Sequence, residues 1–113
     1  MKRGDVWFVN FDPTIGDEIR KTRPAVIVND DAVGTLDLRV IVPITSWHDD
    51  FSDSPWLVRL TPTSANGLVK VSTADAFQVK SLSTQRFIRR LGTLSQEEMD
   101  KVSKALSVVL GTY

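Results

Sequence analysis

Most of the chain alternates between short apolar runs and turn residues, a pattern typical of short strands. Residues 5–11 are apolar on both faces apart from one position, which predicts a strand buried on both sides. Pro24 fits the first position of a strand, and Pro43 predicts a bulge or a strand end. After 5–11, the predicted strands are 24–29, 40–44, 56–60, 68–71, 76–82 and 88–91.

The pattern changes to a helical period after residue 94. Ser95 and Glu98 have the spacing of a capping box, and Gly111 is placed to end the helix. Between them the apolar positions recur every three or four residues, which predicts one amphipathic helix of about four turns. Short strands followed by a single helix indicate a mostly β fold, a compact barrel or sandwich with the helix laid on the sheet.

Residues 12–22 form a polar stretch with neither a strand nor a helix period. Most connections in small domains run about two to six residues, and longer ones often carry function. This stretch is therefore the first place to look for chemistry.

The length and composition narrow the class of protein. The 113 residues correspond to one domain, 1–113, and the absence of cysteine excludes disulfides, thiolate metal sites and a cysteine nucleophile. Charged residues follow Met1 directly and no apolar run approaches the roughly 18 residues of a membrane span, so we expect a soluble, cytoplasmic protein. His48 is the only histidine, which excludes a two-histidine metal site within one chain.

The formal net charge is zero, but the charges are segregated along the chain. Segments 1–24, 25–57, 58–92 and 93–113 carry +1, −5, +5 and −1. The basic segment is either an ordinary solvated surface or one wall of a groove for a polyanion, and charge alone favours the solvated surface.

Two strand ends carry candidate chemistry. Arg23 stands where the long loop enters a strand, and Thr45 and Ser46 stand where another strand ends. A guanidinium fork and hydroxyl donors suit a phosphodiester, although a surface salt bridge and a turn cap explain the same residues equally well. His48 and the pairs Asp30-Asp31 and Asp49-Asp50 are better explained as turn residues than as catalytic or metal-binding groups.

Four segments in order carry RGDVW at 3–7, FDPTIGDEI at 11–19, KTRPAVIV at 21–28 and VPITS at 42–46. Gly67-Leu68, Gln78-Val79-Lys80 and Arg86 continue the pattern, and the closing helix completes it. Together these motifs resemble the MazF/PemK toxin family, the ribonuclease half of bacterial toxin–antitoxin systems, over nearly the whole chain.

The resemblance implies a small SH3-like β-barrel with a C-terminal helix, the CcdB/MazF/PemK-like fold, acting as a homodimer. It implies a sequence-specific endoribonuclease that cuts single-stranded messenger RNA with no metal ion or other cofactor. The 2′-hydroxyl would attack the phosphate, leaving a 2′,3′-cyclic phosphate and a 5′-hydroxyl. The implied partner is an antitoxin whose acidic tail competes with RNA for the same basic groove.

By motif match the catalytic arginine falls on Arg23 and the catalytic threonine on Thr45. Glu18 matches a loop glutamate that contacts RNA in some members, and it is our candidate general base because arginine is a poor one. Phe77 stands where some members carry an acid, with Asp75 two residues earlier. The expected RNA-binding residues are Arg20, Lys21, Ser46, Lys70, Gln78, Lys80 and Arg86, extended by Arg89 and Arg90 in the basic groove.

Aromatic side chains are the expected stacking partners of unpaired bases. The candidates are Trp7, Trp56 and Phe77, of which Trp7 is better explained as a core residue.

Two other classes of function fit the predicted fold. A toxin of the same fold that poisons DNA gyrase by protein contact would leave Arg23 and Thr45 without a role. An SH3-like adaptor would bind a proline-rich peptide in an aromatic groove, which nothing in the sequence requires.

Overall fold

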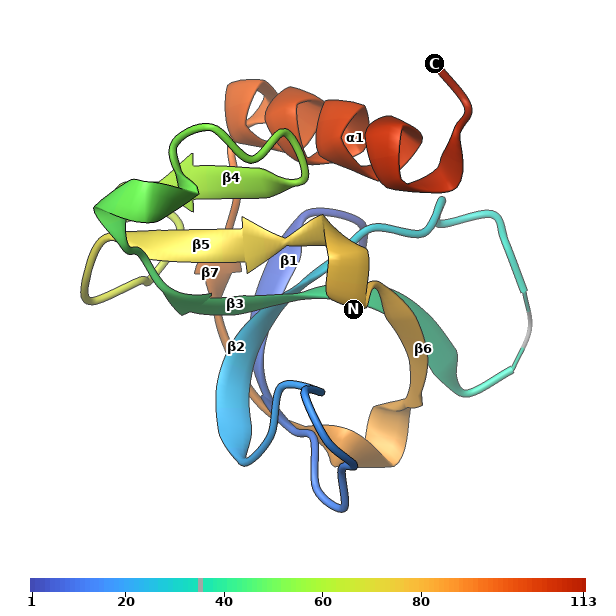
Figure 1. Cartoon of the computed structure of the whole chain (residues 1–113). Coiled ribbons are helices and arrows are strands. Elements are labelled where there is room, and N and C mark those ends of the chain that lie inside the picture. The colour runs from blue at the N-terminus through green and yellow to red at the C-terminus, as the bar shows by residue number, and fades with distance from the viewer. Residues whose placement is uncertain (35) are drawn as a thin grey trace.

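The computed structural model describes residues 1–34 and 36–113, which form an antiparallel sheet and one helix (Figure 1). Short helical turns η1 (Asp49–Phe51), η2 (Ala76–Gln78) and η3 (Thr84–Arg86) join some of the strands. The main elements are β1 (Asp5–Asn10), β2 (Thr22–Ile27), β3 (Leu38–Ser46), β4 (Leu57–Leu60), β5 (Ser72–Asp75), β6 (Lys80–Ser83), β7 (Phe87–Thr93) and α1 (Gln96–Leu110).

The strands follow the order β4-β5-β3-β2-β1-β7, and β6 pairs with β3 beside this path. Strand β3 is therefore shared, because its first half pairs with β6 and its last three residues pair with β5. Within the described residues β4 and β7 do not pair with each other, so the sheet curves without closing. The predicted mostly β fold with a C-terminal helix is confirmed, with the barrel left open.

The two strand prolines occupy positions that differ from the prediction. Strand β2 begins at Thr22, so Pro24 is its third residue and pairs with Phe8 of β1. Pro43 neither bulges nor ends β3, but pairs with Ala25 of β2. On the other side of β3 the pairing with β6 ends at Ile41 and the pairing with β5 begins at Ile44. Pro43 lies between these two ladders, so its missing N–H group breaks no strand hydrogen bond there.

Two predicted strands after residue 60 are wrong in position. Residues 68–71 are not a strand but an irregular segment with a bend at 69–70, and the strand is β5 at Ser72–Asp75. The run predicted at 76–82 divides into η2 and β6. Strand β5 was hidden because its first two residues are polar yet buried: the Ser72 hydroxyl donates to the Lys70 carbonyl, and the Thr73 hydroxyl to the Ser46 carbonyl.

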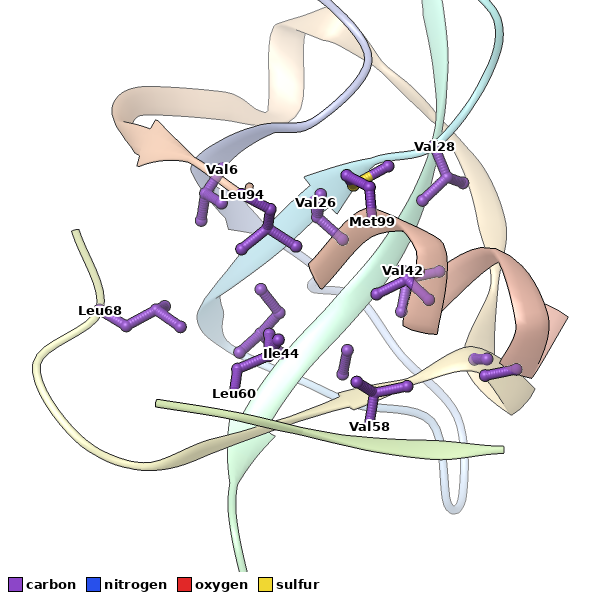
Figure 2. Packing of buried hydrophobic residues seen from close by; sticks show 14 residues of the cluster. Val6, Val26, Val28, Val42, Ile44, Val58, Leu60, Leu68, Leu94 and Met99 are labelled. Atoms are coloured by element: carbon purple, nitrogen blue, oxygen red, sulfur yellow. The ribbon is translucent and has the colours of Figure 1, made fainter. Parts of the chain in front are cut away.

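Strand β1 packs against an apolar cluster on each of its faces, with Val6 in one cluster and Val9 in the other, which confirms the prediction for this strand. One cluster of apolar side chains fills the space between the sheet and α1, and Figure 2 shows Met99 of the helix on one side of it and Val42 and Ile44 of β3 on the other. On the other face Val9, Phe11 and Ile41 belong to a second cluster.

The helix forms as predicted. Ser95 and Glu98 make a reciprocal capping box, and Gly111 ends the helix in the left-handed conformation with φ of 68°. Its buried residues Met99, Val102 and Ala105 form the stripe that packs on the sheet. Within the described part of the chain, no helix has the length and apolar character required to cross a membrane.

Candidate functional site

The sheet register brings Arg23 and Thr45 together. The β2–β3 ladder ends where Ala25 pairs with Pro43, and Arg23 and Thr45 each lie two residues beyond that pair. Residues opposite each other on antiparallel strands project to the same face. Both are half-buried and both line a cleft of about 280 Å³, where the long loop enters β2 and β3 approaches its end.

Four cationic residues line this first cleft, and none of the described residues that line it is acidic. They are Arg23, Lys70, Arg89 and Arg90. The Lys70 ammonium donates to the Ser46 hydroxyl at 2.8 Å, which holds this cation beside a second polar group of the cleft. Four cations gathered at one cleft raise the local positive potential, so the cleft favours an anionic ligand.

The two cations on β7 each contact a side chain of β1. The Arg89 guanidinium lies 4.7 Å from the ring centroid of Phe8, and Arg90 lies 3.5 Å from the Asp5 carboxylate. Both arginines remain exposed, so each pair fixes a direction for the side chain while leaving donors available to a ligand.

Part of the cleft wall was not predicted as part of the site. Leu68 and Val69 line the cleft from the bend after Gly67, where a strand was predicted, and Val69 is 94% exposed. Phe8 and Ser72 also line it. Only the structure shows that residues so distant along the chain share one surface, because β7 and the 61–70 segment meet there.

Glu18, Gln78 and Lys80 form a second cluster. The Glu18 carboxylate accepts from the Ile15 amide at 2.8 Å and lies 3.5 Å from the Lys80 ammonium. The Gln78 side chain accepts from the Ile19 amide at 2.6 Å and donates to the Asp17 carbonyl. These contacts attach the long loop to η2 and β6, and all three residues line a second cleft of about 370 Å³.

The two clefts are related through the sheet. Lys80 pairs with Ile41 and Ile41 pairs with Ile27, so Lys80 projects to the same face as Arg23 and Thr45. Glu18 reaches this face through its ion pair with Lys80. The structure therefore places Glu18 beside the second cleft, apart from the residues that line the first.

Three other basic residues expected at the site have different surroundings. The Arg86 guanidinium donates to the Asn10 and Asp12 carbonyls at 3.2 and 2.6 Å, so it braces the start of the long loop. Lys21 is exposed and has a φ of 67°, and its amide donates to the Asp12 carboxylate. Arg20 is exposed on the same loop and lines neither cleft.

Asp75 is a half-buried carboxyl at the end of β5. It caps η2 by accepting from the Phe77 amide at 3.1 Å. Burial raises the pKa of the Asp75 carboxyl above its ordinary value of 3.8, and hydrogen bonds from Phe77 and Gln78 oppose this rise without cancelling it. The folded chain therefore holds the Asp75 proton more tightly than the unfolded chain does.

Asp75→Asn is expected to stabilise the protein at neutral pH. A raised folded pKa means that stability falls as pH rises from 3.8 through the folded pKa, and the amide removes this loss while it keeps an acceptor for Phe77. Urea denaturation from pH 3.5 to 8 should show the gain at pH 7 shrinking toward low pH. Asp75→Ala is the control, because it loses the cap and should destabilise by about 1 kcal/mol. A gain independent of pH would contradict the assignment.

The remaining polar candidates lie in turns. His48 is exposed and packs edge-on against Phe51, and Asp49 accepts from the indole of Trp47. Asp30 closes the turn to Ala32. Among residues 1–34 and 36–113 no group of three or more His, Asp or Glu side chains is placed to hold a metal ion.

The profile of the family described as PemK-like, MazF-like toxin of type II toxin-antitoxin system matches residues 2–110. Endoribonuclease MazF9 of Mycobacterium tuberculosis is 34% identical over 100% of this chain and 98% of its own length. The crystal structure of MazF from Deinococcus radiodurans superposes with a TM-score of 0.80 at 26% identity, over 98% of this chain and 96% of the other. A MazE-MazF structure from the same organism superposes with a TM-score of 0.74 at 25% identity, over 100% and 97%.

Proposed function

The chain belongs to the PemK-like, MazF-like toxin family of type II toxin–antitoxin systems, and from this membership and the geometry of the first cleft we propose that it is a sequence-specific endoribonuclease acting on single-stranded RNA. Relatives named as endoribonucleases support RNA cleavage as the activity. Messenger RNA is the proposed target, as the family resemblance implies.

The observation that carries this proposal is the shared cleft of Arg23 and Thr45. A phosphodiester placed there meets a guanidinium fork and a hydroxyl donor, with Lys70, Arg89 and Arg90 around it. A gyrase poison would need a protein-binding surface and gives this pair no task. RNA cleavage uses both groups.

In the proposed reaction the ribose 2′-hydroxyl attacks the adjacent phosphorus. A bond forms from O2′ to phosphorus, the bond from phosphorus to O5′ breaks, and the products are a 2′,3′-cyclic phosphate and a 5′-hydroxyl. Charge gathers on the non-bridging oxygens in the transition state, where a well-placed donor is worth about 2.7 to 4 kcal/mol. Arg23 and Thr45 supply these donors, and Arg23 also delivers a proton toward the departing O5′.

The 2′-hydroxyl proton needs an acceptor, and Glu18 is our candidate. Its carboxylate borders the second cleft and pairs with Lys80, so for Glu18 to act the attacking 2′-hydroxyl must come within hydrogen-bond distance of it when RNA binds. General base catalysis typically contributes about 10² to 10⁴ in rate, which sets the loss expected of Glu18→Gln if this role is correct.

An antitoxin is the proposed protein partner. MazE-MazF structures are among the folds that superpose on this chain, and the cationic first cleft suits an acidic peptide tail. Because RNA and the antitoxin tail would bind the same cations, the antitoxin would inhibit RNA cleavage by competing with RNA for the first cleft. We also propose that the chain acts as a homodimer, as the family resemblance implies.

Cleavage is expected to persist in excess EDTA. The proposed reaction draws its charge stabilisation from Arg23 and Thr45, so chelation should leave the rate of RNA cleavage within about two-fold, far below the change from loss of one donor. The test incubates purified protein with mixed-sequence RNA and maps both ends by sequencing. Added Mg²⁺ in a parallel sample is the control. No cuts in either sample would overturn the nuclease proposal, and cuts abolished by EDTA would overturn its mechanism.

A further inference from the structure

Aromatic side chains are exposed at only a few places in this protein. Of its nine aromatic residues, three are exposed: Trp56 at 38%, Phe77 at 72% and Tyr113 at 92%. Trp7, the third stacking candidate from the sequence, packs against Phe87 beside the second apolar cluster. The structure thus leaves Trp56 and Phe77 as accessible stacking candidates.

These two rings form one surface. The Ala76 amide donates to the Trp56 carbonyl at 3.0 Å, which fixes the start of β4 beside η2. The rings of Trp56 and Phe77 meet edge to face with centroids 6.5 Å apart. Phe77 is held by the cap from Asp75 at one end of η2, so its ring is presented to solvent from an ordered turn.

Phe77 also forms a wall of the second cleft, opposite polar groups. Glu18, Gln78 and Lys80 line the same cleft, which brings a carboxylate, an amide and an ammonium next to an exposed ring face. Lys80 projects to the sheet face shared with Arg23 and Thr45. The aromatic surface therefore continues from the polar cluster that borders the candidate catalytic face.

We propose that Phe77, supported by Trp56, is a nucleobase subsite that stacks one unpaired base of the RNA substrate. Gln78 and Lys80 would meet the polar edge of that base. The subsite would add affinity and sequence preference at a nucleotide other than the one whose 2′-hydroxyl attacks, and it rests on the proposed ribonuclease function.

The chemistry of the second cleft favours a base over the other ligands. A phosphate gains no stacking energy from the ring face of Phe77. It would also lie near Asp17 and Glu18, two acidic residues that repel it. An apolar peptide side chain could pack on the ring but would make no hydrogen bond with the ammonium, amide and carboxylates that line the same cleft. A base offers a π-face to Phe77 and donors and acceptors to the polar wall.

The test uses Phe77→Ala, Phe77→Leu and Phe77→Tyr in the full chain. The RNA is a short oligonucleotide carrying the cleavage motif mapped for the parent protein, with 2′-O-methyl at the scissile ribose to prevent attack. Phe77→Ala and Phe77→Leu should weaken binding roughly ten- to hundred-fold, and Phe77→Tyr should keep it. Tyr113→Ala, which removes an exposed aromatic ring outside both clefts, is the matched control and should bind as the parent does.

A fluorescent base locates the subsite. With 2-aminopurine placed at each position in turn, one position should be quenched on binding to the parent and not on binding to Phe77→Leu. An abasic nucleotide at that position should weaken RNA binding by the parent but not RNA binding by Phe77→Ala. The reason is that both changes remove the same contact.

The outcomes separate this inference from the proposed function. If the parent cuts no RNA, the ribonuclease proposal falls and the subsite falls with it. If the parent cuts RNA but Phe77→Ala binds it equally well and no position is quenched, the subsite alone is overturned. Unchanged RNA binding together with weaker inhibition by an antitoxin would make Phe77 a protein contact and would also overturn the subsite.

Discussion

Arg23→Ala is expected to lower turnover of RNA by about 10² to 10³-fold while the protein keeps its native melting profile. The guanidinium lines the first cleft, where it would face the non-bridging oxygens of the attacked phosphate, and loss of one such donor typically costs this much in kcat. The fold should survive, because Arg23 belongs to neither apolar cluster. Single-turnover cleavage and thermal denaturation measure the two effects.

Conservative variants separate the proposed chemistry from packing. Arg23→Lys keeps the charge but loses the planar fork, so it should recover only part of the rate. Thr45→Ala should fall in the same range as Arg23→Ala, and Thr45→Ser should recover because the hydroxyl returns.

The matched control is Arg39→Ala. Arg39 is half-buried like Arg23. It lies near the start of β3, at the opposite end of that strand from Thr45, and it lines neither the first nor the second cleft. Its removal should leave cleavage unchanged. If Arg23→Ala cuts RNA at the parent rate, or if Arg39→Ala loses as much cleavage rate as Arg23→Ala, the site is misplaced.

The sequence predicted those parts of the fold that local pattern decides. The doubly apolar run at 5–11 became a strand with a cluster on each face, and the capping box at Ser95 became the start of α1. Strand β5 escaped because burial of Ser72 and Thr73 depends on partners elsewhere in the chain. Pro43 was misjudged because the gap between β6 and β5 along β3 has no sequence signal.

The same division holds for the candidate site. Arg23 and Thr45 were identified by their motifs, and the β2–β3 register accounts for their meeting in one cleft. The sequence did not reveal that the Arg86 guanidinium donates to the Asp12 carbonyl of the long loop, or that Glu18 lies beside the second cleft. Both depend on how the long loop folds onto η2 and β6, which local pattern does not specify. The catalytic and RNA-binding roles themselves stay predictions.

The wall of the first cleft depends on a close approach of two backbones. Asn66 is fully buried and its side chain accepts from the Thr63 and Leu68 amides and donates to the Thr61 carbonyl. This network folds the segment that leads into Val69 and Lys70, and Thr93 of β7 donates to the Ala65 carbonyl at 2.8 Å. The two chain segments lie so close that only glycine fits between them.

Gly92→Ala is expected to destabilise the protein by about 3 kcal/mol or more. A Cβ at Gly92 would lie 2.2 Å from the Ala65 carbonyl oxygen, which is backbone and has no rotamer to change. Overpacking usually costs about 1 to 3 kcal/mol, and a clash with fixed backbone belongs at or above the top of that range. Thermal denaturation should show a loss of at least about 10 °C for a domain of this size.

Two other glycines isolate the cause. Gly16 has a φ of 58° with open space around it. Gly16→Ala should therefore destabilise the protein only by the strain of holding alanine in the left-handed conformation, about 1 to 2 kcal/mol. Gly67 has a φ of 70° and a Cβ there would lie 2.1 Å from the Leu91 carbonyl oxygen, so Gly67→Ala carries both penalties. The expected order of stability is Gly16→Ala, then Gly92→Ala, then Gly67→Ala as the least stable. If Gly92→Ala were as stable as Gly16→Ala, β7 and the 61–70 segment would not be in the close backbone contact that forms this wall of the first cleft.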